Sequence, residues 1–288
     1  GIIKGYSDGS FRPKNAITRA EMSQLLVRSI GTLVNGGGEQ VLGDVYGTVT
    51  VNQPGTVLKD TRIAGDLYIT GGLGTGAVTL DNVVVTGKII IAGGGEAEAG
   101  NDSVILRNVE AENLTVDTTN GQYVSLRAEG DTSIKNALLR TNAFVQDRTD
   151  AGYGLLNLTL NGRTDDPQFS LSGNLKDIVN LTPDSTVNIS AGTAQSFVVD
   201  ETAIDSSLNI GNDATVRELN LDAATNVTGT GDIGKVTVGA NGSTITMLPD
   251  TIDVRPGVTA NIYGQDMDNK LGLESSADPR ILASYPIM

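Results

Sequence analysis

The side chains that could do chemistry in this chain are mainly carboxylates, arginines and lysines, because the chain contains no cysteine and no histidine. Their absence excludes thiol nucleophiles, disulfides, cysteine-ligated zinc and histidine general bases. Two clusters place aspartate beside arginine: Asp147 precedes Arg148, and Asp165–Asp166 closely follow Arg163. A glycosidase needs paired carboxylates across a sugar, and a calcium-dependent lyase needs clustered aspartates with a basic residue. These clusters are the candidates for sugar chemistry.

The surroundings of both clusters argue against catalysis. Each lies in a turn-rich stretch, where aspartate is common for conformational reasons. The chain has no tryptophan to stack on a sugar, and Tyr123 and Tyr153 stand alone in the sequence. The glycine-rich Gly71–Gly76 lacks the Lys-Ser/Thr pair and the helix of a phosphate-binding loop. The sequence therefore predicts neither an enzyme nor a cofactor; Ca²⁺ would suit the acidic surface, but no motif specifies it.

The composition indicates many short strands joined by turns. Only 4% of the 288 residues are aromatic, so the core must be built from Val, Ile, Leu and Ala. The 36 glycines favour turns and positive φ angles. A formal net charge of −14 repels phosphate backbones and anionic lipid, which argues against nucleic-acid binding. The chain has no apolar run of about 18 residues, so no membrane insertion is expected.

The residues around Thr18 form a helix-start signal near the beginning of the chain. Thr18 and Glu21 have the spacing of a capping box, in which each side chain bonds the backbone of the other residue. Met22, Leu26 and Ile30 then recur at helical spacing. We therefore expect an amphipathic helix of about 12 residues, which is too short to be stable without partners.

This opening stretch resembles a family of cell-surface modules. The segment GIIKGYSDGSFRPKNAITRAEMSQLLVRSIG (Gly1–Gly31) contains Gly-Ile-Ile-x-Gly-Tyr, Asp-Gly-x-Phe-Arg-Pro and Ile-Thr-Arg-Ala-Glu, followed by the helix. It is similar to the second half of a surface-layer homology (SLH) repeat. Ser7 and Ser10 stand where the family commonly has Pro and Thr, and the first helix of the repeat has no counterpart here.

The resemblance implies attachment to a bacterial cell wall. SLH repeats usually occur in threes and bind secondary cell-wall polysaccharide in pockets between repeats. By matching positions, Arg19 would approach an acidic sugar substituent, while Asp8 and the backbone near Gly5 would line the groove. A solvated Arg19 in the first helical turn is the alternative, and Glu21 is interpreted as a helix cap. Because sister repeats are missing, we expect binding only through an intact SLH array and interpret the chain as a piece of a longer protein.

From residue 58 onward the sequence repeats itself. Leu58–Ile69 (LKDTRIAGDLYI) and Leu80–Ile91 (LDNVVVTGKIII) align without a gap at an offset of 22 residues. Val199–Ile210 keeps the same apolar spacing, and shorter alternating stretches continue to Gly264. Alternation puts one side of each strand inward, while Gly or Asn between strands lets the chain turn.

This repeat predicts an all-β fold, a right-handed parallel β-helix (β-solenoid) with a short α-helical SLH remnant at its N-terminus. Each repeat would form one coil and cover the apolar side of its neighbour, with room for about ten coils. Leu58 would lie against Leu80, and Ile69 against Ile91. A β-sandwich array is the alternative, which the constant offset disfavours.

The remaining expectations concern the turns and the chain's organisation. Asp60 and Asn82 are expected to form an inward turn ladder, and Gly93–Asn101 is expected to be a projecting loop. The assigned units are a partial SLH repeat (residues 1–31), a glycine-rich linker or cap (32–46), the parallel β-helix (47–265), and a C-terminal cap or linker to a further domain (266–288).

Together these features predict a structural cell-surface protein of the S-layer type, located outside the cell at a Gram-positive-type wall. SLH repeats would anchor it to wall polysaccharide, and the solenoid would serve as a rigid spacer, lattice or filament module with homotypic contacts. The alternative is a surface adhesin or a polysaccharide-binding or -degrading β-helix. In such a binder, Asp, Tyr and Arg would gather on one face over several coils.

Overall fold

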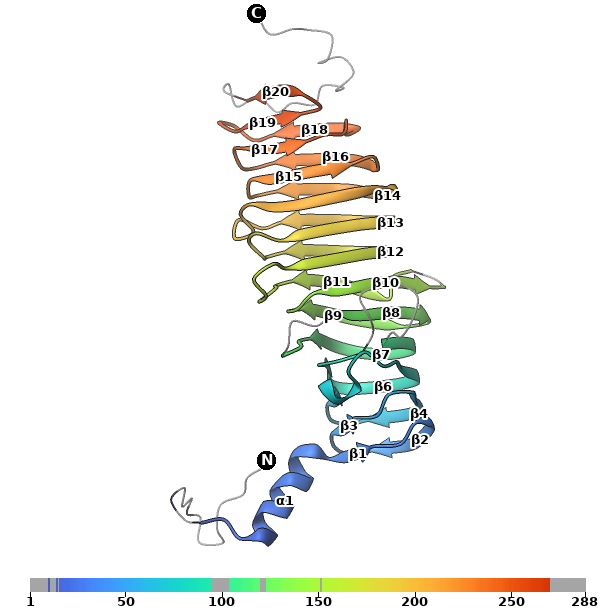
Figure 1. Cartoon of the computed structure of the whole chain (residues 1–288). Helices are drawn as coiled ribbons and strands as arrows, with labels where there is room; N and C mark the ends of the chain where they lie inside the picture. Colours follow the sequence, from blue (N-terminus) through green and yellow to red (C-terminus); the bar gives the residue numbers. More distant parts are fainter. Residues whose placement is uncertain are drawn as a thin grey trace, which may run out of the picture.

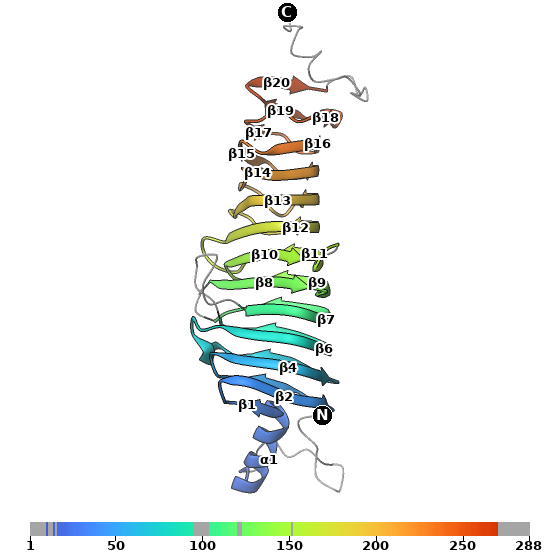
Figure 2. The ribbon, with the colours of Figure 1, turned by 90° about the vertical axis from the view of Figure 1, so that its right-hand side faces the viewer.

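The chain forms a β-solenoid of about 11 turns, with 62% of the residues in strands and 5% in helix. The coordinates are a computed structural model, which describes residues 10, 14, 16–94, 104–119, 123–150 and 152–269. Strands stack as rungs along one axis, and helix α1 (Arg19–Ile30) lies at the end of the stack where the chain begins (Figures 1 and 2). The right hand of the coil stays a prediction.

Each coil is built from short strands or from longer strands that bend around its corners. In chain order the strands and the single 3₁₀ turn are β1 (Thr32–Val34), β2 (Gly38–Val45), β3 (Val49–Val51), β4 (Thr56–Ile63), β5 (Leu67–Ile69), η1 (Gly71–Leu73), β6 (Val78–Ile91), β7 (Val104–Val116), β8 (Val124–Gly130), β9 (Ser133–Leu139), β10 (Ala143–Thr149), β11 (Leu155–Leu160), β12 (Gln168–Asn180), β13 (Thr186–Val199), β14 (Ser206–Leu221), β15 (Thr225–Gly229), β16 (Asp232–Val238), β17 (Ser243–Ile245), β18 (Thr251–Val254), β19 (Thr259–Ile262) and β20 (Gln265–Asp268).

A single coil has three extended segments separated by two corners. In the coil of β4 and β5 the segments are residues 56–59, 61–63 and 67–69. Asp60 makes the first corner with a φ of 45°. Gly65 lies at the second, where an added Cβ would be 2.6 Å from the carbonyl of Gly47 in the preceding coil, so only glycine fits.

The stacking of like residues is confirmed. Leu58 pairs with Leu80 and Ile69 with Ile91, in parallel register, and all four side chains are buried. Each inward column therefore removes aliphatic surface from water along the stack, which is the main source of stability for a coil that cannot bury its own face. From one end to the other, the Ile69 column reads Val34, Val51, Ile69, Ile91, Val116, Leu139, Leu160, Asn180, Val199, Leu221, Val238 and Val254.

The expected inward ladder of Asp60 and Asn82 is wrong in its direction. Both residues are exposed and adopt left-handed φ angles of 45° and 56°. Asn and Asp tolerate this conformation best among residues with a Cβ. The ladder itself exists on the outside of the corner, where the Asn82 amide donates a 2.6 Å hydrogen bond to the Asp60 carboxylate.

Residues 32–46, expected from the sequence to be a linker or cap, contain strands β1 and β2 of the first coil. Strand β1 pairs with β3, and β2 pairs with β4 from Gly38 to Val45. Among the described residues this coil has a strand neighbour on one side only, and Leu33 and Val41 remain 50% and 58% exposed. The glycines allow the bends, with left-handed φ angles at Gly38 and Gly43.

At the other end the stack is closed by the one antiparallel pairing of the described strands, between β19 and β20. Tyr263 and Gly264, both with left-handed φ, make the two-residue turn of this hairpin. The expected C-terminal cap or linker (residues 266–288) is described only up to Asn269; residues 270–288 lie outside the described part, as do residues 95–101 of the expected projecting loop. Among the described helices, none is long and apolar enough to cross a membrane.

Candidate functional site

The SLH-like segment is described from its helix start onward. Arg19 is exposed and is the first residue of α1, whereas Gly5 and Asp8 lie outside the described residues. The capping box is confirmed: the backbone N–H and the hydroxyl of Thr18 donate to a Glu21 carboxylate oxygen at 2.9 and 2.7 Å, and the Glu21 N–H donates back to the hydroxyl at 3.2 Å. Glu21 is therefore a cap, and Arg19 is exposed in the first turn of the helix.

The capping box gives this helix start a pH dependence. The bond from the Thr18 backbone N–H, followed by that from its hydroxyl, lowers the pKa of Glu21 below its ordinary value of 4.5. A lowered folded-state pKa stabilises the helix above the unfolded pKa, and this stabilisation is lost as the pH falls through the folded pKa. In an NMR titration of the full chain, we expect the amide resonance of Thr18 to shift below pH 4.5 as Glu21 titrates. In the Glu21→Gln variant this shift should be absent.

Along the first segment of several coils, outward charges alternate in sign. Lys59, Asp81, Arg107, Glu129 and Arg148 occupy successive positions of one column, here called the charge ladder. Arg107 lies 3.7 Å from Asp81 and 3.0 Å from Glu129, measured between guanidinium nitrogen and carboxylate oxygen. Such exposed pairs add little stability individually, but like charges after a register slip would repel. The ladder therefore helps to specify the register of neighbouring coils.

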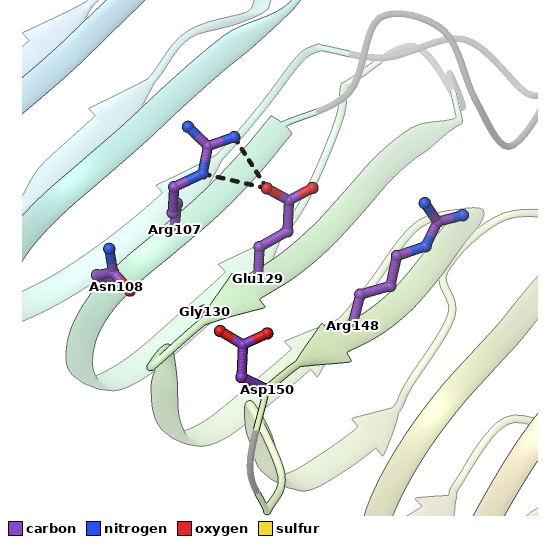
Figure 3. A pocket seen from close by; sticks show the side chains of 6 residues that line it. All are labelled: Arg107, Asn108, Glu129, Gly130, Arg148 and Asp150. Carbon is purple, nitrogen blue, oxygen red and sulfur yellow. Dashed lines mark hydrogen bonds and ion pairs between the residues drawn. The ribbon is translucent and has the colours of Figure 1, made fainter.

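A hollow of about 370 Å³ opens beside the charge ladder at the first corner of three successive coils (Figure 3). Its volume lies within the range of small-molecule sites, although it is shallow and polar. Its two arginines and two carboxylates could hold acidic groups and hydroxyls of a ligand. The lining residues are Arg107, Asn108, Glu129, Gly130, Arg148 and Asp150.

Asp147 is a structural carboxylate and does not form a sugar site with Arg148. Its side chain points inward and is 2% exposed, while Arg148 points outward. The carboxylate accepts hydrogen bonds of 2.7–3.1 Å from the backbone N–H groups of Thr149, Gly154 and Leu155 and from the Thr149 hydroxyl. It therefore holds the turn between β10 and β11 in place.

The second carboxylate cluster is also dispersed. Arg163 lies 3.7 Å from Asp117, and exposed Asp166 accepts a 2.8 Å bond from the Gln168 amide. No group of three or more Asp or Glu side chains in the described ranges is arranged to hold a metal ion. Arg163 and Asp166 are thus engaged with other residues of the solenoid.

Tyr123 is not isolated, because its ring packs beside Phe144 of the next coil. The ring centroids are 5.3 Å apart with an interplanar angle of 37°. The Tyr123 hydroxyl donates a 2.8 Å bond to Gln168, one coil further. Burial, and then the charge of Asp166, raises the pKa of Tyr123 above 10.0. The pair was not predicted from the sequence because its members lie 21 residues apart. The signal that could have found it is that this separation is close to the length of one coil.

Known proteins resemble parts of this chain. Residues 1–23 match the S-layer homology domain, and the search of curated proteins gave no match. Among solved structures, the chain is similar to chitinase ChiW from Paenibacillus sp. str. FPU-7, described as a bacterial cell-surface-expressed multi-modular enzyme machinery. That similarity has 15% identity and a TM-score of 0.46, and covers 70% of this chain but 16% of ChiW. The SLH match indicates a cell-surface protein anchored at the cell wall.

Proposed function

We propose that this chain is the spacer part of a structural cell-surface protein of the S-layer type. The SLH region of the intact protein holds it to secondary cell-wall polysaccharide, with Arg19, Asp8 and the backbone near Gly5 at the sugar groove. The solenoid extends away from the wall and associates with copies of itself. The continuous register of strands from β1 to β19 is the observation that supports this proposal best.

Rigidity follows from how the coils are joined. Every coil is hydrogen-bonded to the next along parallel strands, and one apolar cluster extends from Val34 to Ile262. Bending such a stack would separate packed side chains and stretch a ladder of backbone bonds on one side. A stack of this kind resists bending better than domains joined by flexible linkers. These properties suit a spacer or lattice element.

The third segment of the coils offers a surface for lateral association. Its outward residues, here called the outer column, are mostly β-branched or apolar and are half-buried. Nine successive pairings at about 4.8 Å make the column about 43 Å long. A flat row of this length is the type of surface that packs against a second sheet. The column consists of Thr50, Tyr68, Ile90, Thr115, Leu138, Thr159, Val179, Val198, Asn220 and Thr237.

Electron microscopy of the purified chain, paired with sedimentation over a concentration series, tests this role. We expect ordered sheets or fibres, and we expect Val179→Asp/Val198→Asp to abolish them by placing charges in the outer column. Thr193→Asp/Thr215→Asp is the matched control, since these half-buried residues are also paired in neighbouring coils but lie on the second segment. Single particles at every concentration, or equal effects of both double variants, would contradict the lattice role.

A further inference from the structure

We propose that the outward surface over β8 and β10 binds an acidic oligosaccharide. The site is a strip of four residues, Tyr123, Phe144, Gln146 and Arg148, which ends at the hollow beside the charge ladder. It gives a specific place to the glycan-binding alternative and is independent of the structural role of the solenoid. The aromatic pair, an unpartnered amide and an unpaired guanidinium support the proposal separately.

The aromatic end of the strip departs from the way this protein uses large rings. Of the phenylalanines in the described ranges, Phe169 and Phe197 are buried inside the stack, whereas Phe144 faces outward and is half-buried. Tyr123 lies beside it, and its hydroxyl is held by Gln168 two coils from the tyrosine backbone. The tyrosine ring thus spans neighbouring coils and forms, with Phe144, a fixed apolar plate. Such a plate offers a large contact area at a low cost in side-chain entropy.

Gln146 is the second observation. It lies between inward-facing Val145 and Asp147, so its side chain points to the outside, yet it is only 9% exposed. Its amide makes no hydrogen bond to any residue in the described part of the chain. Its amide atoms are not among the enclosed, unpaired polar atoms of the described residues, so they reach the surface and can bond water or a ligand. Sugar hydroxyls, which donate and accept, match both halves of an amide.

Arg148 supplies the charge at the other end. Glu129 is already engaged by Arg107 at 3.0 Å and by Arg127 at 2.7 Å. Figure 3 shows Arg107 directed at Glu129, whereas Arg148 extends away from both Glu129 and Asp150. Arg148 has no ion-pair partner among the described residues, so its planar fork is free for a bidentate bond to a carboxylate.

The spacing of these groups selects an extended ligand. Phe144, Gln146 and Arg148 are alternate residues of β10 and point to the same side, about 13 Å from first to last. A short chain of sugar rings could lie on the aromatic plate, bond Gln146 through hydroxyls and place an acidic group at Arg148. Asp150 and Glu129, at the hollow, would accept bonds from neighbouring hydroxyls. The ligand class is therefore an oligosaccharide with a carboxylate substituent.

Isothermal titration calorimetry on the full chain tests this, using the trisaccharide of galacturonic acid as acidic probe and cellotriose as neutral probe. We expect tighter binding of the acidic probe by about tenfold or more, the range of one charge-assisted bidentate contact. Arg148→Gln should remove this preference and leave cellotriose binding unchanged. Arg217→Gln is the matched control, because Arg217 is another exposed arginine without a partner among the described residues and lies outside the strip. It should bind both probes as wild type does.

Gln146→Leu separates binding from folding. If the amide awaits a ligand, its replacement should keep or raise the melting temperature while weakening binding of both probes several-fold. A lower melting temperature with unchanged binding would assign Gln146 a purely structural role and overturn the proposal. Absence of binding by both probes to the wild type, or equal affinity for them, would overturn it as well.

Discussion

An Asp147→Ala variant is expected to be about 3–5 kcal/mol less stable than the wild type, because it leaves several buried donors without an acceptor. The carboxylate accepts bonds from three backbone N–H groups and one hydroxyl between Thr149 and Leu155. Asp147 lies in the inward column that contains Leu58 and Leu80. Between Gln40, the first described member, and Asp147, every described member of this column is aliphatic. Removing the carboxylate therefore takes away the hydrogen bonds that hold the turn and also leaves a cavity.

Urea denaturation followed by circular dichroism measures this loss. Asp150→Ala is the control, since Asp150 is exposed and only three residues away. Its effect should stay within about 0.5 kcal/mol, as for most surface substitutions. A variant Asp147→Ala that unfolds at the same urea concentration as Asp150→Ala would show that the carboxylate does not organise the turn.

Gly173→Ala is expected to have an effect of similar size, about 3–5 kcal/mol, from two causes that add. Gly173 has a φ of 95°, which residues with a Cβ rarely adopt. An added Cβ would also lie 1.8 Å from the backbone carbonyl oxygen of Asp147 in the neighbouring coil. Because the obstacle is backbone, relief requires the two coils to separate.

Gly257→Ala is the control that separates these causes. Gly257 has a comparable φ of 80°, but a Cβ there would meet nothing within 4 Å. It should cost only about 1–2 kcal/mol, the penalty of the left-handed conformation itself. Equal unfolding midpoints for the two variants in thermal denaturation would mean that the coils are not in close contact at Gly173.

The sequence was sufficient to predict the stacking of coils, for a physical reason. Like residues often stack on one another in neighbouring coils: Leu58 and Leu80 repeat at the length of one coil, and Asp60 and Asn82 repeat at its corner. The direction of these two polar side chains was mispredicted because an inward corner and an outward corner show the same alternation of polar and apolar residues in the sequence. Only the left-handed φ, which Asp and Asn favour, distinguishes the outward corner.

The register of the later coils could not be predicted because the coils differ in length. Leu80 pairs with Leu106, 26 residues on, whereas Leu58 pairs with Leu80, 22 residues on. A single offset therefore fails after the second repeat, and the register can be followed only in three dimensions. The first coil was not predicted for a different reason. Among the described strands β2 pairs with β4 alone, and its polar sequence lacks the alternation of a covered strand.

The candidate site could be predicted least. Phe144 looks like a core residue in sequence, since apolar residues of a strand usually face inward. Phe144 faces outward because side chains alternate in direction along β10, and Val145 and Asp147 take the inward positions. Asp147 itself was grouped with Arg148 for chemistry because adjacency in sequence does not reveal that neighbouring residues of a strand face opposite sides.

The coils stack into one stiff rod, and a single distance between two labelled residues measures whether they do. The chain has no cysteine, so Thr50→Cys/Thr237→Cys can be labelled with nitroxides at these two positions alone. Nine register pairings separate the two positions, which places them about 43 Å apart at 4.7–4.9 Å for each step. Double electron–electron resonance should give one narrow peak near that distance, broadened only by the label linkers. A broad distribution, or a peak at a much shorter distance, would contradict the stacked and rigid solenoid.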